Sequence, residues 1–225
     1  MAEPKKPIKL YFFGDSICFG QYVSTHKTWT TRVSHSVSEH YKARDINVLT
    51  QVAAVNGETT RGALMRLEHD VLAHSPTIVW VQFGLNDANY WQSDRGLPRT
   101  TVSSFVANMC EICERLQVCG TKRILVSTNH RVTKKLIHLD EDVYSRNCDL
   151  YNSELRALVK RFASPSVYLV DVRNELEQIT ASPDQYLMED GVHLNEFGHS
   201  LYWEYALRNL VALIDGVITE SEVVV

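Results

Sequence analysis

The sequence has no apolar run long enough to cross a membrane, because no window approaches the roughly 20 apolar residues that a spanning helix needs. It also has no basic surplus: 23 Lys and Arg stand against 27 Asp and Glu, for a formal net charge of −4. Nucleic-acid partners require many cations to neutralise phosphates, so we expect none here. The N-terminal segment holds only about six apolar residues before Gly14, too few for the core of a secretory signal, and we predict a cytoplasmic protein.

Cysteine is scarce and odd in number, with five in 225 residues. An odd set favours reduced thiols over a disulfide framework. Cys110 and Cys113 form a C-x-x-C, but they lie in a stretch whose apolar residues recur at helical spacing, and no second Cys or His pair follows at zinc-site distance. We therefore predict no metal site. Linkers rich in Gly, Ser or Pro and internal repeats are also missing, which predicts a single domain over residues 1–225.

What the sequence does contain is a regular alternation of strand-like and helix-like segments. Short apolar runs predict strands over residues 8–13, 46–53, 77–83, 122–128 and 166–172. Helical periodicity predicts helices over about 28–41, 59–73, 101–118 and 143–162, with a last helix after Asn195. This alternation is typical of a parallel sheet covered on both faces, the α/β class.

Polar motifs follow several of the predicted strands. "GDS" (14–16) follows the first strand, Gly57 in "NGET" the second, and "GLND" (84–87) the third, while "DGVH" (190–193) stands in the loop before the last helix. In open parallel sheets, ligands bind at the carboxyl ends of the strands, so we expect the motifs to meet there.

The residue types in these motifs suit nucleophilic catalysis. A serine hydroxyl such as that of Ser16 is a weak nucleophile unless a base takes its proton, and His193 is the candidate base. Asp190, three residues earlier, can orient the imidazole and stabilise its protonated form. The N–H groups of Ser16 and Gly57 and the side-chain amide of Asn86 are candidate donors to the oxyanion that would form.

In this order the motifs resemble the blocks of the SGNH (GDSL-type) hydrolase family, named for its Ser, Gly, Asn and His. The matching positions, spread over residues 14 to 193, are Ser16, Gly57, Asn86, Asp190 and His193. The resemblance implies a flavodoxin-like three-layer α/β/α fold with a central sheet of about five strands. It also implies ester hydrolysis through an acyl-enzyme, without metal or cofactor. One departure is Ile17, where the family name has Leu. The G-x-S-x-G elbow of ordinary α/β-hydrolases is missing.

Each motif has an ordinary structural explanation when it is taken alone. Gly-Asp-Ser is common turn chemistry in which Ser16 could cap a helix. The conjunction of all four motifs, in order, favours catalysis over that explanation. We expect Asp15 to shape its turn, Asp87 to brace the loop of Asn86, and His199 to have a structural role.

Two long insertions are candidates for the substrate site. Residues 87–101 offer Tyr90, Trp91 and Arg95, and residues 129–147 are unusually long for a connection between a strand and a helix. Aromatic faces beside polar groups suit a sugar ring, and the basic run "RVTKK" suits an anionic group. The alternative is that the aromatic residues pack the loop down and that the basic run is solvated.

We predict a serine esterase acting on small O-acyl esters, with an O-acetylated carbohydrate as the leading hypothesis. A lysophospholipase or acyl-thioesterase with the same triad is the alternative. A flavodoxin-like protein binding FMN or another phosphate is disfavoured by Asp15 and by the apolar residues 17–19 after the first strand. An inactive scaffold of the same family is disfavoured by the intact motif residues.

Overall fold

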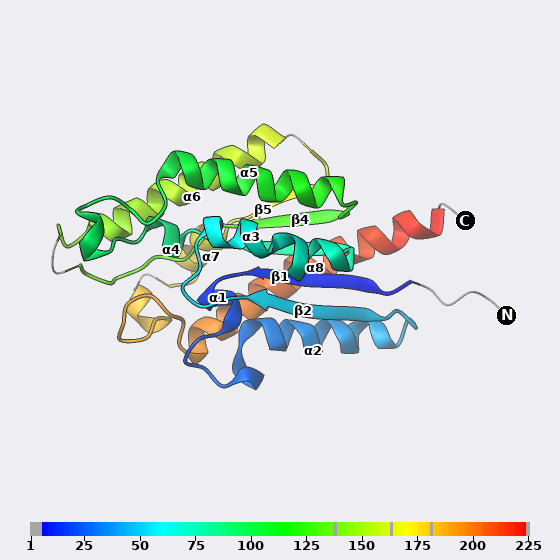
Figure 1. The fold of residues 1–225 in the computed structure, drawn as a ribbon. Coiled ribbons are helices and arrows are strands. Elements are labelled where there is room, and N and C mark those ends of the chain that lie inside the picture. The colour runs from blue at the N-terminus through cyan, green and yellow to red at the C-terminus, as the bar shows by residue number, and fades with distance from the viewer. Residues whose placement is uncertain (1–5, 137–138, 163, 181, 224–225) are drawn as a thin grey trace.

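Five parallel strands form the central sheet of the computed structural model, which describes residues 6–136, 139–162, 164–180 and 182–223. The strands are β1 (Ile8–Gly14), β2 (Val48–Ala54), β3 (Ile78–Gln82), β4 (Arg123–Ser127) and β5 (Val167–Val170). They lie side by side in the order β2-β1-β3-β4-β5 (Figure 1). This is the order of flavodoxin-like sheets, and the predicted fold class is confirmed.

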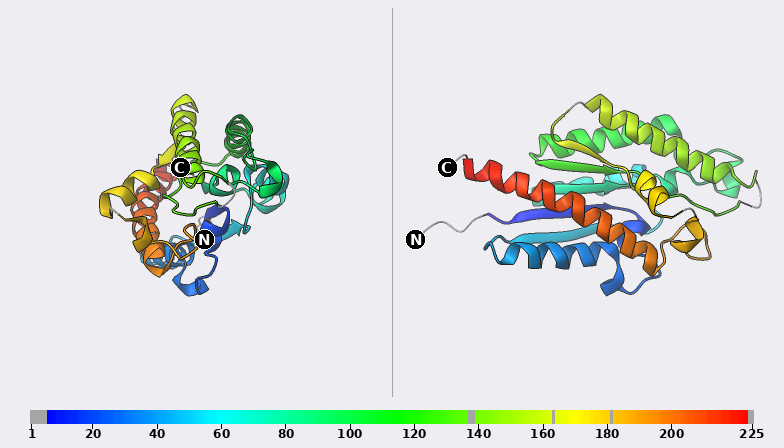
Figure 2. Two further views of the ribbon diagram at one scale, coloured as in Figure 1. Left: turned by 90° about the vertical axis from the view of Figure 1, so that its left-hand side faces the viewer. Right: turned by 180° about the vertical axis from the view of Figure 1, so that it is seen from behind.

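Helices cover both faces of the sheet, as the end view in Figure 2 shows. On one face lie α2 (Trp29–Lys42) and α8 (Glu196–Val223), with α7 (Val172–Ile179) beside α8; on the other lie α3 (Thr60–Asp70), α5 (Val102–Val118) and α6 (Val143–Phe162). The short helices are α1 (Ser16–Phe19) and α4 (Leu85–Ala88), and single 3₁₀ turns are η1 (Thr25–Lys27), η2 (Leu72–His74), η3 (Gln92–Asp94) and η4 (Pro183–Gln185). None of the described helices is both long and apolar enough to cross a membrane.

The sequence explains the elements it builds. Every residue of β3 is buried, as its continuous apolar run predicts for a strand covered on both sides. Two of the long helices begin at threonine caps: Thr28 accepts from the N–H of Thr31 at the start of α2, and Thr101 accepts from the N–H of Ser104 at the start of α5.

The predicted strand over residues 166–172 ends too late. Asp171 accepts a hydrogen bond from the N–H of Asn174 and caps α7, so the chain leaves the sheet after Val170. The helices α1 and α4 were not predicted, because four residues are too few to display a helical period.

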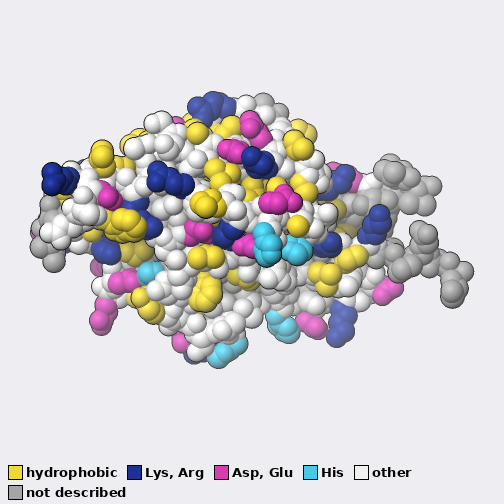
Figure 3. Space-filling model, in the orientation of Figure 1, with side chains coloured by type: hydrophobic (Ala, Val, Ile, Leu, Met, Phe, Trp, Pro, Cys, Tyr) yellow, Lys and Arg dark blue, Asp and Glu magenta, His cyan; other side chains and the backbone are white. Residues whose placement is uncertain are grey.

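On the face of the molecule shown in Figure 3, Lys and Arg are interspersed with Asp and Glu. The basic side chains do not gather into one patch on this face.

The carboxyl ends of β1 and β3 lie next to each other, with Gly14 opposite Gln82. Here the chain order of the sheet reverses, because β2 lies on one side of β1 and β3 on the other. A switch point of this kind leaves a crevice in which open α/β sheets bind ligands. Ser16 follows β1 and Asn86 follows β3, so both lie at this crevice.

A buried pair of asparagines attaches the insertion after β4 to α6. The N–H of Asn129 donates to Oδ1 of Asn152 (2.8 Å), and Nδ2 of Asn152 donates to the carbonyl oxygen of Asn129 (2.8 Å). One side chain thus satisfies both backbone groups of a buried residue.

Replacing Asn152 with Ala leaves a buried N–H and a buried C=O of Asn129 unpaired. We expect Asn152→Ala to lower the free energy of unfolding by about 3 kcal/mol. Urea denaturation followed by circular dichroism measures the change, with the exposed neighbour Ser153→Ala as control. A loss no larger than that of the control contradicts this account of the pair.

Candidate active site

Ser16 lies at the first position of α1, in a turn that is held from two sides. Oδ1 of Asp15 accepts from the N–H of Ile17 (3.0 Å), so the cap of α1 is Asp15 and not Ser16. From α2, Nε1 of Trp29 donates to the carbonyl oxygen of Ile17 (2.8 Å). The Ser16 hydroxyl is thereby left available to face the crevice.

Ser16, His193 and Asp190 form a continuous hydrogen-bonded series. Oγ of Ser16 lies 2.9 Å from Nε2 of His193, and Nδ1 of His193 lies 2.5 Å from Oδ2 of Asp190. Burial raises the pKa of Asp190, but hydrogen bonds from the ring and N–H of His193 and from the N–H of Val192 outweigh it, and the net pKa is lowered. Asp190 is therefore an ionised acceptor for Nδ1–H of His193, and this tautomer leaves Nε2 to accept from the Ser16 hydroxyl.

Gly57 lies in a tight turn beside Ser16. The turn is closed by the N–H of Glu58 and the carbonyl oxygen of Val55 (3.4 Å), and Gly57 adopts φ 73° at its third position. A Cβ on Gly57 would meet no protein atom within 4 Å, so it is the positive φ, and not crowding by the protein, that favours glycine here.

Asn86 lies in α4, and its side-chain amide is bonded to the buried carboxyl of Asp15. Nδ2 of Asn86 donates to Oδ2 of Asp15 (3.2 Å). Burial raises the pKa of Asp15 to about 7, although its hydrogen bond with the N–H of Ile17 opposes this shift. Asp15 thus shapes the turn, as expected, and also orients Asn86.

Asp87 ties α4 to the start of α3. Its carboxylate accepts from the N–H of Thr60 (3.0 and 3.1 Å) and from the Thr60 hydroxyl (2.6 Å). A carboxylate at a helix N-terminus satisfies free N–H groups and interacts favourably with the helix dipole. The expected bracing of the Asn86 loop therefore takes this form.

The motif residues line one pocket of 330 Å³, whereas Asp15 and Asp87 lie outside its lining. Its lining residues are Ser16, Gln21, Asn56, Gly57, Leu85, Asn86, Asn89, Lys134, Tyr144, Asp190, Val192 and His193. Gln21, Asn56 and Asn89 were not predicted as site residues, although each follows a strand and lies near a motif residue. Lys134 and Tyr144 come from the insertion 129–147, which was predicted to reach the substrate site.

The three residues predicted to bind substrate lie outside this lining. Tyr90 is half-buried and bridges to Pro98, Trp91 is 55% exposed, and Arg95 lies on the exposed loop with φ 52°. Their role in substrate binding stays a prediction. Tyr22, which was not predicted to lie at the site, packs its ring edge-on to that of His193, with 5.2 Å between the ring centroids.

A buried chain of hydrogen bonds runs beneath the site. Sγ of Cys18 donates to Oε1 of Gln82 (3.4 Å), and Nε2 of Gln82 donates to the Tyr202 hydroxyl (3.3 Å). That hydroxyl bonds Nδ1 of His130 (2.7 Å), and Nε2 of His130 bonds the carbonyl oxygen of Val192 (2.8 Å). Since a carbonyl only accepts, Nε2 carries the proton and Nδ1 accepts from Tyr202. The chain therefore positions the residue next to His193.

The insertion after β4 is also joined to the loop of Asp190 and His193. The N–H groups of Thr133 (2.8 Å) and Lys134 (3.2 Å) both donate to the carbonyl oxygen of Gly191. Gly191 has φ 68°, and a Cβ there would lie 2.6 Å from the backbone nitrogen of Lys134, so the contact requires glycine.

His199 is buried at the start of α8 and caps another helix. Its Nδ1 accepts from the N–H of Trp29 (3.2 Å), the first residue of α2. Burial lowers the pKa of His199 to about 4, so the ring is a neutral acceptor. The structural role expected for His199 is this cap.

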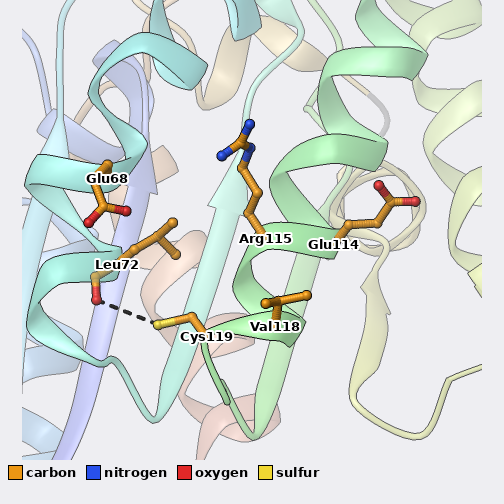
Figure 4. A pocket seen from close by; sticks show the side chains of 6 residues that line it. All are labelled: Glu68, Leu72, Glu114, Arg115, Val118 and Cys119. Carbon is orange, nitrogen blue, oxygen red and sulfur yellow. Dashed lines mark hydrogen bonds between the residues drawn. The ribbon is translucent and has the colours of Figure 1, made fainter.

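A second groove lies between α3 and α5, near the amino ends of the strands and away from the switch point (Figure 4). Its lining residues are Glu68, Leu72, Glu114, Arg115, Val118 and Cys119. The Cys119 thiol donates to the carbonyl oxygen of Leu72 (3.5 Å), and no imidazole is among these lining residues. This groove therefore lacks the serine–imidazole pair that is found at the switch point.

The fold and site define a class: an α/β protein whose switch point holds Ser, His and Asp in the arrangement that serine hydrolases share. The sequence model of the GDSL-like lipase/acylhydrolase family matches residues 12–201. The chain belongs to this family and is a hydrolase acting on ester bonds.

Individual relatives are distant. The chain is 22% identical over 205 residues to an arylesterase of Vibrio mimicus, covering 90% of this chain and 88% of the relative. The acetyl xylan esterase AlAXEase superposes with a TM-score of 0.72 at 21% identity, covering 90% of this chain and 99% of that one. Axe2, an acetylxylan esterase from Geobacillus stearothermophilus, gives 0.72 at 19% identity, covering 92% and 95%. These structural likenesses establish the shared fold.

The buried imidazole of His130 predicts a pH-dependent stability. Burial lowers its pKa to about 4, whereas an unfolded histidine takes up its proton near pH 6.5. The unfolded chain therefore binds more protons between these values, and stability is lost as the pH falls through this window. The contribution of His130 amounts to about 2 kcal/mol between pH 7.5 and pH 5.

We expect His130→Gln to shrink the difference in unfolding free energy between pH 7.5 and pH 5 by that amount. A glutamine amide can donate to Val192 and accept from Tyr202 without titrating. Urea denaturation at the two pH values measures the effect, with the exposed His26→Gln as control. If His130→Gln shows the same difference in unfolding free energy between the two pH values as the unmodified protein, His130 is not buried in its neutral form.

Proposed function

We propose that the protein is a serine esterase that removes small O-acyl groups, acetyl groups foremost, from a carbohydrate. The observation that supports this proposal most directly is the bonded series of Ser16, His193 and Asp190, with separations of 2.9 and 2.5 Å. The reaction needs neither a metal nor a cofactor, because each step uses these side chains and water.

In the proposed mechanism, Oγ of Ser16 attacks the ester carbonyl carbon while Nε2 of His193 takes the hydroxyl proton. Asp190 holds the ring and stabilises its protonated form. The alcohol leaves with the proton from His193, and an acyl group remains on Ser16. Water, deprotonated by the same imidazole, then releases the acid and restores the serine.

The oxyanion of each tetrahedral intermediate is proposed to bind the N–H groups of Ser16 and Gly57 and Nδ2 of Asn86. All three residues line the same pocket. Within the described chain, the N–H groups of Ser16 and Gly57 have no hydrogen-bond acceptor, so they are available to a ligand. Such preorganised donors act mainly on the transition state.

The pocket supports a small, polar substrate. Its 330 Å³ lies at the lower end of the range for small-molecule sites, and only Leu85, Tyr144 and Val192 give it apolar side chains. Three neutral amides outside the proposed oxyanion hole and the Lys134 ammonium can bond hydroxyl or anionic groups of a sugar. Long acyl chains require an extended apolar surface, which this lining does not provide.

Lysophospholipid or acyl-thioester hydrolysis uses the same chemistry and remains the alternative within the proposal. The cytoplasmic location expected from the N-terminal segment likewise stays a prediction.

Ser16→Ala removes the proposed nucleophile. We expect kcat/KM for 4-nitrophenyl acetate to fall by about 10³-fold or more, since no other group can form the acyl-enzyme. Release of 4-nitrophenol measures the rate, and the exposed Ser93→Ala serves as control. Activity of Ser16→Ala close to that of the unmodified protein would exclude Ser16 as the nucleophile.

A panel of substrates tests the acyl group and the alcohol. We expect kcat/KM to fall at least about tenfold from 4-nitrophenyl acetate to the octanoate, because the lining lacks apolar surface for the longer chain. Acetylated xylooligosaccharides should release acetate. Higher activity on the octanoate, on lysophosphatidylcholine or on an acyl-CoA would instead favour the alternative substrates.

A further inference from the structure

Arg99 lies behind two of the three proposed oxyanion donors, and its guanidinium donates hydrogen bonds to neutral acceptors on both of them. Nη1 donates to Oδ1 of Asn86 (3.1 Å), and Nη2 donates to the carbonyl oxygen of Gly57 (2.9 Å). Among the described residues, Arg99 forms no ion pair, unlike most of the arginines of this chain.

We propose that Arg99 is a positioning residue that holds Asn86 and Gly57 in the geometry of an oxyanion hole. The inference rests on the proposed function, because it concerns how the donors of that reaction are oriented. Arg99 itself is not among the residues that line the pocket, so it acts through its two partners.

The Asn86 amide is held at both of its ends. Arg99 donates to its oxygen, and the Asp15 carboxyl accepts from its nitrogen (3.2 Å). Rotating the amide by 180° would point the NH₂ group at the guanidinium, donor against donor, and the oxygen at the carboxyl. One hydrogen of Nδ2 is occupied by Asp15, and the other remains for the pocket.

The bond from Arg99 also changes the electronic character of the Asn86 amide. A cation that donates to Oδ1 draws electron density from the amide and makes the remaining N–H a stronger donor. Bonds to charged groups are about twice as strong as neutral ones. Orientation and donor strength thus come from one contact.

Gly57 is fixed in a different way. Arg99 bonds its carbonyl oxygen, which belongs to the peptide that follows Gly57, whereas the proposed oxyanion donor is the N–H of the peptide that precedes it. A glycine at φ 73° has wide conformational freedom, so anchoring the following peptide restricts where its N–H points.

Arg99 is itself held in place. The guanidinium carbon of Arg99 lies 4.4 Å from the ring centroid of Trp91, and the backbone N–H of Arg99 donates to the carbonyl oxygen of Asn89 (2.8 Å). The next residue, Thr100, donates its N–H to the carbonyl oxygen of Asp87 (3.1 Å). The segment that carries Arg99 is therefore bonded to α4 and the residue after it, next to Asn86, and Trp91 supports the cation from the loop.

The first test replaces Arg99 with Met, which keeps the aliphatic stem, and with Lys, which keeps the charge but cannot bond both acceptors in the same way. We expect Arg99→Met to lower kcat for 4-nitrophenyl acetate by about 10- to 100-fold, with KM changed less than about threefold, because the oxyanion exists only beyond the ground state. The kcat of Arg99→Lys should lie between that of Arg99→Met and that of the unmodified protein. Rates are normalised to the fraction of enzyme that a fluorophosphonate labels at completion, which corrects for misfolded protein.

Arg32 provides a matched control that is not among the residues lining the pocket. Its guanidinium carbon lies 3.9 Å from the ring centroid of Trp203, and it donates to the Ser200 hydroxyl (2.7 Å), so it too combines an indole contact with a neutral acceptor. Arg32→Met should leave kcat unchanged. An equal loss of kcat in Arg32→Met and Arg99→Met would mean that the loss reflects general destabilisation, and it would overturn the proposal.

A double-mutant cycle tests whether Arg99 acts through Asn86. Asn86→Ala alone should cost about 10²-fold in kcat. In that background Arg99→Met should lower kcat by less than about fivefold, because only the contact with Gly57 is left to lose. The inference is overturned if Arg99→Met lowers kcat as much in the Asn86→Ala background as in the unmodified protein, or if Arg99→Met raises KM without changing kcat.

The failure of this inference can be told from the failure of the proposed function. If Ser16→Ala retains activity, the proposed function fails; if Ser16→Ala is inactive while Arg99→Met keeps its kcat, only the present inference fails.

Discussion

The hydrogen bond between Ser16 and His193 joins residues 177 positions apart in the chain, and much of the surrounding structure serves to maintain it. On the Ser16 side, the Asp15 cap and the bond from Trp29 hold a helix of a single turn. On the His193 side, the polar chain ending at Val192 and the backbone bonds to Gly191 hold a loop. Neither segment is long enough to hold its own geometry, so both depend on neighbours.

Below the pocket, most of the hydrogen bonds that hold these segments in place are formed by neutral groups. Gln82, Tyr202 and His130 are buried and bonded in series without an ion pair, and Asn129 and Asn152 are bonded to each other. Burying a neutral, fully bonded group costs far less desolvation energy than burying a charge. Satisfied networks of this kind also restrict motion, which suits the proposed oxyanion hole, whose donors must be in place before the substrate arrives.

The strands, the long helices and the motif residues could be predicted from the sequence. Buried strands appear as apolar runs, and open parallel sheets bind ligands at the carboxyl ends of their strands. It failed where the signal depends on contacts across the fold. Gln21 and Asn56 are ordinary loop residues until the turns around Ser16 and Gly57 bring them together. His130 falls in an insertion that was predicted to contribute to the substrate site, yet its side chain is fully buried. Arg99 belongs to no motif, and its contacts with Asn86 and Gly57 form only once β2 and β3 lie on either side of β1.

The contact between the insertion and Gly191 uses only main-chain atoms of residues 133 and 134. These two hydrogen bonds therefore do not depend on which side chains stand at these positions, except that proline lacks the N–H group. A family built on this frame can exchange the chemical character of the rim, charged for neutral or large for small, without disturbing the loop that carries the imidazole. In the proposed site, the chemical character of the rim and the position of His193 can therefore change independently of each other.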